Sequence, residues 1–199
     1  PMNIEKNGRY IRISIQPGGY YSTGEPAMIT TLLGSCIAAC LYDPEVKIIG
    51  MNHFMLSNTR YSQDLPIYAT EAGKYGIHAM ELLINDMLSR GARKHRIRAK
   101  VFGGASIMIN REKVGNFACV GSVNCKFIRE FLNSEGIPIV AENLGGTSGR
   151  VIHFMNGDFS IYMRRIDHTR SERLATRDRE CWQRAIEMQE KTMPSIELW

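Results

Sequence analysis

The sequence predicts an α+β domain with a layered architecture, in which strands pack in a sandwich-like core, two main helices lie outside it and a helical extension follows. Short apolar runs bounded by glycine, proline and Asp-Pro signals recur along the chain and predict about eight or nine strands. Two longer segments, 70–90 and 123–134, carry apolar residues at helical spacing. Each such element must bury its apolar face against another, so layers of strands and helices are expected.

The N-terminal part of the chain is predicted to be mainly extended. Residues 9–15 alternate polar and apolar side chains, as a half-buried strand does, and 28–33 form a second extended run. The apolar run 37–42 ends at Asp43-Pro44 and is typical of a buried strand. Residues 46–56 follow as its antiparallel partner, with the Asp-Pro turn between the two strands.

The later part of the chain alternates helices and strands. Helix 70–90 is predicted to end at Gly91 and to turn one apolar face inward, formed by Ile77, Met80, Leu83, Ile84, Met87 and Leu88. Ser122 is the expected N-cap of helix 123–134. Further strands are predicted at 97–102, 137–141, 150–155 and 159–164, and an Asn156-Gly157 hairpin turn joins the last two.

A single domain is expected, because the chain of 199 residues shows no internal repeat, linker or low-complexity run. Residues 1–166 form its main part, and 167–199 form a charged C-terminal helical extension of the same domain. A thin apolar stripe runs through the extension at helical spacing: Leu174, Cys181, Ala185 and Met188. We expect an exposed helix packed loosely on the domain; the alternative is a segment that docks a partner or covers the protein itself.

Composition argues against membrane and nucleic-acid functions. No apolar run approaches the ~20 residues that span a bilayer, and no secretion signal is recognised, so we expect no membrane insertion and a cytoplasmic location. The net charge is +5. The densest basic run, which contains Arg93, Lys94, Arg96 and Arg98, has no interleaved aromatic residues and is typical of the solvated end of a helix. We therefore expect no nucleic-acid partner.

The five cysteines, Cys36, Cys40, Cys119, Cys125 and Cys181, indicate reduced thiols rather than a metal site or a disulfide framework. Their number is odd, no CxxC pair occurs, and the spacings match no zinc pattern. The Gly103-Gly104 pair lacks both nucleotide-binding signatures. We therefore expect no metal ion and no cofactor.

Cys36 belongs to a Gly34-Ser35-Cys36 turn, and the predicted hairpin brings His53 back toward it on the neighbouring strand. A nearby imidazolium stabilises a thiolate, which can attack a carbonyl carbon while the imidazole returns the proton to a departing amine. Backbone N–H groups around Ser35 can point at a developing oxyanion, and Gly34 leaves room for a substrate. Asn52 is a further candidate for substrate or oxyanion support. The alternative is a buried core cysteine beside a core histidine.

Five motifs that contain glycine occur in order along the chain: 33–36 (LGSC), 50–56 (GMNHFML), 99–105 (AKVFGGA), 121–124 (GSVN) and 144–150 (LGGTSGR). Together they resemble the chemoreceptor glutamine deamidase family, CheD, over roughly residues 8–166. The resemblance implies that 1–166 form a CheD-like deamidase domain with the same layered arrangement. It also implies that Cys36 is the nucleophile, that His53 is its histidine and that Thr30, six positions before the cysteine, assists them.

The resemblance implies a function in chemotaxis adaptation. The expected reaction converts glutamine side chains on the cytoplasmic helices of methyl-accepting chemoreceptors to glutamate, through a thioester on Cys36. The phosphatase CheC is an expected second partner. Two alternatives stay open: hydrolysis of glutamyl methyl esters on the same receptors, which passes through the same acyl-enzyme, and a non-enzymatic module that regulates a chemotaxis phosphatase.

Overall fold

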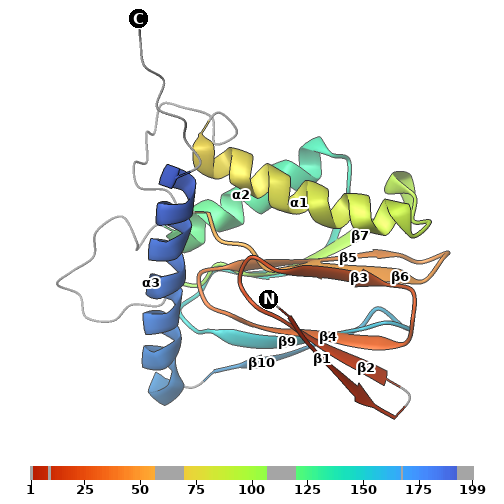
Figure 1. Ribbon diagram of the computed structural model, residues 1–199, viewed down its shortest axis with the longest axis horizontal. Helices are drawn as coiled ribbons and strands as arrows, with labels where there is room; N and C mark the ends of the chain where they lie inside the picture. The colour runs from red at the N-terminus through yellow and green to blue at the C-terminus, as the bar shows by residue number, and fades with distance from the viewer. Residues whose placement is uncertain (1, 9, 57–69, 107–119, 167, 192–199) are drawn as a thin grey trace, which may run out of the picture.

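The structure is a computed structural model that describes residues 2–8, 10–56, 70–106, 120–166 and 168–191. Ten strands in these ranges form two five-stranded sheets stacked face to face (Figure 1). Helices α1 (Glu71–Ser89) and α2 (Val120–Ser134) cover one sheet, and α3 (His168–Lys191) stands across one end of both sheets (Figure 1). The predicted α+β layers, sandwich-like core and C-terminal helix are therefore confirmed.

The sheet that faces away from α1 and α2, called the outer sheet here, has the strand order β1-β2-β4-β9-β10. Its strands are β1 (Met2–Asn7), β2 (Tyr10–Ile15), β4 (Ala27–Leu33), β9 (Arg150–Met155) and β10 (Ile161–Arg165). Neighbouring strands run antiparallel except β2 and β4, which are parallel. Strand β4 thus occupies the middle of the sheet and leads directly into the turn that carries Cys36.

The central sheet lies between the outer sheet and the two helices, with the strand order β3-β6-β5-β7-β8. Its strands are β3 (Tyr20–Thr23), β6 (Ile48–Asn52), β5 (Ile37–Asp43), β7 (Arg98–Gly103) and β8 (Ile139–Leu144). Here β7 and β8 are the parallel pair, and the other neighbours are antiparallel. The predicted β5–β6 hairpin is confirmed, with Cys40 opposite Met51.

Two apolar clusters hold the three layers together. One lies between the central sheet and the helices and includes Leu41, Leu83 and Phe127. The other lies between the two sheets and includes Ile29, Phe154 and the Cys36 thiol. Strand β5 contributes to both clusters, so it is buried on both faces, and this explains why its sequence is almost continuously apolar rather than alternating.

The strands that the sequence did not predict lie at sheet edges. Among the described strands, β1 pairs with β2 alone and leaves Ile4 49% exposed, and β3 has four residues and pairs with β6. Strand β1 carries an exposed apolar side chain, and the buried residues of the short β3 are the polar Ser22 and Thr23, so neither strand shows the apolar alternation that predicts a strand.

Three details of the helices differ from the sequence predictions. Helix α2 begins at Val120, so Ser122 lies inside the helix and is not its N-cap. Leu88 is 36% exposed, because it lies at the rim of the inward face of α1. Thr70, predicted as the first residue of helix 70–90, is the N-cap of α1: its hydroxyl accepts the N–H of Gly73 at 3.0 Å. The predicted loop 57–66 and the side chains of Ala185 and Met188 lie outside the described residues.

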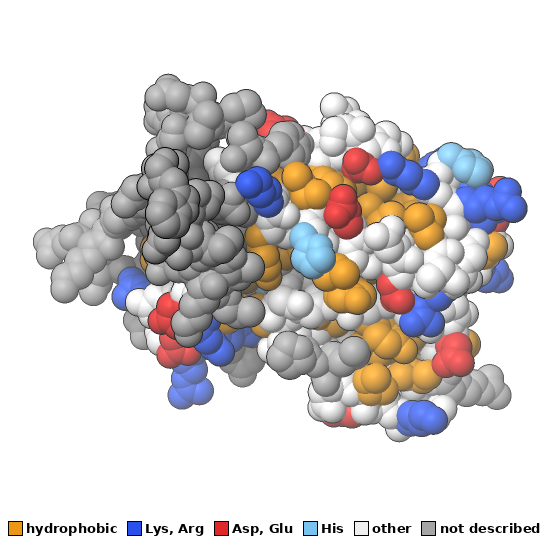
Figure 2. Space-filling model, turned by 45° about the horizontal axis from the view of Figure 1, so that its top comes forward, with side chains coloured by type: hydrophobic (Ala, Val, Ile, Leu, Met, Phe, Trp, Pro, Cys, Tyr) orange, Lys and Arg blue, Asp and Glu red, His pale blue; other side chains and the backbone are white. Residues whose placement is uncertain are grey.

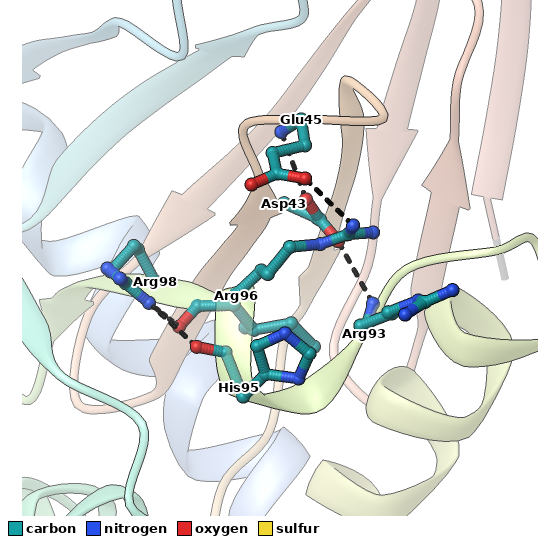
Figure 3. A network of polar contacts seen from close by, with 7 residues as sticks. Asp43, Glu45, Arg93, His95, Arg96 and Arg98 are labelled. Carbon is teal, nitrogen blue, oxygen red and sulfur yellow. Dashed lines mark hydrogen bonds and ion pairs between the residues drawn. The ribbon is translucent and has the colours of Figure 1, made fainter.

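Asp43 centres a polar network at the end of β5 that lies away from Cys36 (Figure 3). Its carboxylate accepts the main-chain N–H of Arg93 and the Nε of Arg96, each at 2.9 Å, and Arg96 also pairs with Glu45. Burial acts to raise the pKa of Asp43, but hydrogen bonds from Arg93, Arg96 and Glu45 outweigh it and hold the pKa below its usual range. Arg96 of the basic run therefore fastens the β5–β6 turn to the segment before β7.

The helix-covered side of the molecule mixes apolar side chains with charges of both signs (Figure 2). Lys94, another member of the basic run, pairs with Glu135 at 2.6 Å. His78 is exposed on α1. Within the described ranges, no helix is long and apolar enough to cross a membrane.

Candidate active site

The turn between β4 and β5 holds Cys36 at the end of the sandwich, and main-chain bonds fix its shape. The N–H of Gly104 donates to the carbonyl of Cys36 at 2.8 Å, and the N–H of Ala105 donates to the carbonyl of Gly34 at 2.9 Å. The backbone of the Gly103-Gly104 pair therefore packs closely against the cysteine turn. Gly103 has a φ of 116°, and a Cβ there would overlap the Cys36 carbonyl oxygen, so only glycine fits.

Asn124 of α2 ties this turn to the segment that follows His53. Its Nδ2 donates to the carbonyl of Ser35 at 2.8 Å, and its Oδ1 accepts the N–H of Leu56 at 2.9 Å. Asn124 is fully buried, so both bonds are made away from water. One amide side chain therefore fixes the spacing between the cysteine turn and the histidine segment.

Strand register places Cys36 and His53 on one face of the central sheet. Ile37 pairs with Phe54 through two main-chain bonds of 2.9 Å, which continues the β5–β6 register beyond the ends of the named strands. In this register His53 is opposite Ala38, two residues from Cys36 along β5. Diagonal neighbours of this kind have Cβ atoms less than roughly 8 Å apart on the same face. Both side chains point into the space between the sheets, where Cys36 belongs to the apolar cluster.

Thr31 of β4 fixes the protonation of His53. Its Oγ1 donates to the carbonyl of Ile15 at 2.8 Å and lies 2.7 Å from Nδ1 of His53. With the hydroxyl proton on the Ile15 carbonyl, Oγ1 accepts from the imidazole, which assigns the hydrogen to Nδ1. Nε2 is then the basic nitrogen, and it is buried without a hydrogen-bond partner among the described residues. The imidazole is oriented by Thr31, with its free lone pair available for another group.

The assisting role that the resemblance implies for Thr30 is not supported by its contacts. The Thr30 hydroxyl donates to the carbonyl of Ile152 at 2.9 Å, on the other face of β4. Successive strand residues point to opposite faces, and Thr31 shares the inner face with Ile29 and Leu33. The threonine that contacts His53 is therefore Thr31.

The three candidates for oxyanion support make different contacts in the structure. Asn52 accepts the N–H of Ala39 and donates to the carbonyl of Ala79, so its amide fastens β5 to α1 and does not face the thiol. Gly34 does not have a positive φ, and its carbonyl is bound by Ala105. The N–H of Ser35, by contrast, donates to a carboxyl oxygen of Asp178 at 2.6 Å. Of the three candidates, Ser35 is therefore the one whose N–H binds a carboxyl oxygen next to the cysteine.

Helix α3 covers this end of the sandwich. Asp178 is 1% exposed and also accepts the Ser35 hydroxyl at 3.0 Å, while Arg177 donates to the carbonyl of Leu32 at 2.8 Å. Cys181 and Trp182, one turn further, pack against the cluster that contains Cys36. Cys36 itself is 0% exposed. The thiol is therefore buried, and side chains of α3 pack against its cluster.

Both members of the pair are held neutral by this environment. Burial raises the pKa of the Cys36 thiol well above its ordinary value, Asp178 and Cys181 raise it further, and Arg177 opposes them. Burial, followed by the charge of Arg177, lowers the pKa of His53 from 6.5 to about 3. The arrangement is a neutral thiol and a neutral imidazole on one face of the central sheet, and Nε2 of His53 makes no hydrogen bond to the thiol.

Of the residues at this candidate site, the sequence predicted Cys36 and His53 but not Thr31, Asn124 and Asp178. Thr31 was detectable, because it alternates with Ile29 and Leu33. Asn124 was detectable as a polar residue beside the inward apolar residues of α2. Asp178 had no local signal, because it is one of many charges in a charged helix.

Comparisons with known proteins give a consistent result. The family model described as CheD chemotactic sensory transduction matches residues 55–165. A Geobacter sulfurreducens protein named probable chemoreceptor glutamine deamidase CheD 1 is 54% identical over 192 residues, covering 96% of this chain and 95% of that protein. A Shewanella oneidensis protein named probable chemoreceptor glutamine deamidase CheD 2 is 43% identical over 179 residues, covering 89% and 88%.

Among solved structures, the Bacillus licheniformis hypothetical protein YfiH is similar, with 16% identity and a TM-score of 0.33. The similarity covers 62% of this chain and 49% of that one. A likeness at this level carries no argument about function.

Proposed function

This chain belongs to the CheD family, and on that premise we propose that it hydrolyses the side-chain amide of glutamine residues on bacterial chemoreceptors, giving glutamate and ammonia. The observation that supports this most directly is the hydrogen-bonded series from Ile15 through Thr31 to His53. It leaves Nε2 of His53 basic and without a hydrogen-bond partner among the described residues, on the same face of the central sheet as Cys36. An oriented base beside a thiol is the arrangement that activates a cysteine nucleophile.

The proposed reaction begins when the Cys36 thiol transfers its proton to Nε2 of His53. The thiolate attacks the carboxamide carbon, and the Ser35 N–H stabilises the oxyanion that forms. The carbon–nitrogen bond then breaks as His53 gives its proton to the departing ammonia, leaving a thioester on Cys36. His53 next deprotonates water, which attacks the thioester. The carbon–sulfur bond breaks, the thiolate regains its proton, and glutamate is released.

Thr31 acts as a positioning residue in this scheme. It holds Nδ1 protonated, so Nε2 is unprotonated and aimed away from Thr31. A hydroxyl cannot supply the negative charge that a carboxylate gives an imidazolium in a Ser-His-Asp triad, so its contribution is smaller. Because Cys36 is buried, turnover also requires a movement that uncovers the thiol.

We place the reaction in the cytoplasm, on the receptors' cytoplasmic helices, and include the phosphatase CheC as a second partner competing for the same surface. These assignments follow from the family resemblance. They predict that added CheC lowers the rate at which the protein deamidates a receptor fragment.

The experiment that tests the function is mass spectrometry of a purified receptor cytoplasmic fragment incubated with the protein. We expect a time-dependent mass increase at particular glutamines, as amide-to-acid conversion gives, together with ammonia release. The Cys36→Ala variant should lose both, whereas Cys40→Ala, which removes another buried thiol from the same strand face, should retain activity. Retained turnover in Cys36→Ala, or release of methanol from methylated receptor without any ammonia from glutamine, would contradict the proposal.

A further inference from the structure

Helix α3 meets the active-site end through one face over three successive contacts. Leu174 and Ala175 are buried in a small cluster with Ala105, next to the partly buried Leu32 and Ile166. Asp178 reaches Ser35 one turn later, and Cys181 follows at the cluster that contains Cys36. The positions 174, 178 and 181 are separated by four and three residues, the spacing of one helix face. The helix therefore packs on the domain through one face, and Asp178 lies at the centre of that face.

The carboxyl group of Asp178 is poorly satisfied for a buried acid. Oδ2 accepts two hydrogen bonds, from the N–H and the hydroxyl of Ser35. Oδ1 is buried and has no hydrogen-bond donor among the described residues, and Nη2 of Arg177 lies 3.8 Å from it. Burying an acid with one unpaired oxygen costs free energy, which the two hydrogen bonds from Ser35 offset only in part. An acid that is buried at this cost calls for an explanation beyond stability.

The chemistry of the site supplies that explanation. Ser35 directly precedes Cys36, and a backbone N–H beside the nucleophile is where an acyl-transfer enzyme binds the oxygen of the reacting carbonyl. A carboxyl group carried by a helix places one oxygen on that donor. It resembles the glutamate product of the proposed reaction, shortened by one methylene group.

We propose that α3 is an autoinhibitory segment: it occupies the groove in which a substrate helix binds, with the Asp178 carboxyl group at the position of the substrate's carboxamide. This inference rests on the proposed function for the identity of the substrate. If α3 occupies the substrate's place, the substrate is itself a helix, with the reactive glutamine at the centre of the face that binds. Small or apolar side chains occupy positions four before and three after that glutamine, as Leu174 and Cys181 do around Asp178.

The state of the thiol agrees with this role. Burial and the nearby Asp178 both raise the pKa of Cys36. Departure of α3 removes the acid and admits water, and both changes favour the thiolate. The family model ends at residue 165, before α3 begins at His168, so the covering helix lies beyond the region that it matches.

The first test compares Asp178→Ala with Glu180→Ala, which removes an acid from an exposed position of the same helix. Iodoacetamide modification of Cys36 is followed by peptide mass spectrometry, with the buried Cys40 as internal reference. A charge-assisted hydrogen bond corresponds to roughly a tenfold to hundredfold change in an equilibrium constant. We therefore expect Asp178→Ala to raise Cys36 modification and receptor deamidation by at least about tenfold, and Glu180→Ala to match the wild type. Equal rates in all three proteins would overturn the proposal.

The second test asks whether a substrate helix and α3 compete. In the Cys36→Ala variant, which binds without turnover, we expect a receptor cytoplasmic fragment to raise iodoacetamide modification of Cys181, because α3 is displaced. Binding of the fragment with Cys181 modification unchanged would overturn the shared groove.

The two proposals fail differently in these tests. If Asp178→Ala exposes Cys36 but neither protein deamidates the receptor, the covering role stands and the proposed function fails. If the wild type deamidates the receptor and Asp178→Ala changes neither rate, the function stands and autoinhibition fails.

Discussion

A single hydroxyl decides which nitrogen of His53 is basic. Thr31 donates to the Ile15 carbonyl, so it can only accept from the imidazole, and the proton stays on Nδ1. Thr30, one residue earlier, makes a similar bond to the Ile152 carbonyl on the opposite face of β4. The two threonines are therefore a natural matched pair, because each satisfies one buried carbonyl and only one touches the histidine.

We expect Thr31→Val to lower the deamidation rate by roughly ten- to hundredfold, less than the ~10⁴-fold loss when a triad carboxylate is replaced, because the hydroxyl carries no charge. Thr30→Val is the control: it loses a hydrogen bond to a buried carbonyl, worth about 1 kcal/mol of stability, but leaves His53 oriented. Rates of receptor deamidation and thermal unfolding of both variants provide the measurement. A larger loss of rate in Thr30→Val than in Thr31→Val would reverse this assignment.

At the scale of elements, the cysteine turn is rigid because a second segment, 103–105, binds it through the main chain. Two bonds from Gly104 and Ala105 hold the carbonyls of Cys36 and Gly34. This close approach requires a glycine at position 103, where a side chain would collide with backbone that cannot rotate away. The end of β7 is thus part of the support for the nucleophile, although it contributes no side chain to the chemistry.

We expect Gly103→Ala to be far more damaging than Gly91→Ala. Both glycines have a positive φ, 116° and 106°, so both substitutions carry backbone strain of roughly 1–3 kcal/mol. Nothing lies within 4 Å of a Cβ at Gly91, whereas one at Gly103 meets Cys36, which adds at least about 2 kcal/mol. Chemical denaturation of both variants measures the difference. Equal losses of stability would mean that the 103–105 segment moves freely away from the turn.

At the scale of the whole molecule, the histidine sits between two sheets, and its protonation is therefore coupled to folding. Burial and Arg177 lower the pKa of His53 from 6.5 to about 3, so the unfolded chain binds a proton more readily than the folded protein does. His53 thus contributes full stability above pH 6.5, and this contribution is lost as the pH falls from 6.5 toward 3. Asp43, whose pKa is lowered, adds a loss only at the acidic end of this range.

We expect the free energy of unfolding to fall by about 2 kcal/mol through His53 between pH 6.5 and about pH 5. The His53→Asn variant, in which an amide N–H replaces Nδ1–H, should lack this part of the pH dependence. His78→Asn, the same substitution at an exposed position of α1, should keep it. Denaturant titrations at several pH values measure the slopes, and parallel curves for the wild type and His53→Asn would refute the coupling.

The layered fold follows from local patterns that each residue carries with it. Apolar runs, turn signals and helical spacing placed most strands and both covering helices, because each element must bury one face. The edge strands β1 and β3 were not predicted, since neither shows a clear alternation of apolar and polar residues. The thiol–imidazole pair was also within reach of the sequence, because a hairpin fixes the register of residues that are close along the chain.

What only the tertiary structure decided are the contacts between layers. Asp178 meets Ser35 across 143 positions, and Asn124 meets it across 89. Neither contact is visible as a periodic pattern in the sequence, because each depends on how α3 or α2 packs against the sheets rather than on the residue pattern within the helix. The choice between Thr30 and Thr31 was likewise settled by which face of β4 turns toward the central sheet. The local sequence placed the predicted thiol–imidazole pair on one face of the sheet, because a hairpin sets its own register, whereas packing decided what orients and covers that pair.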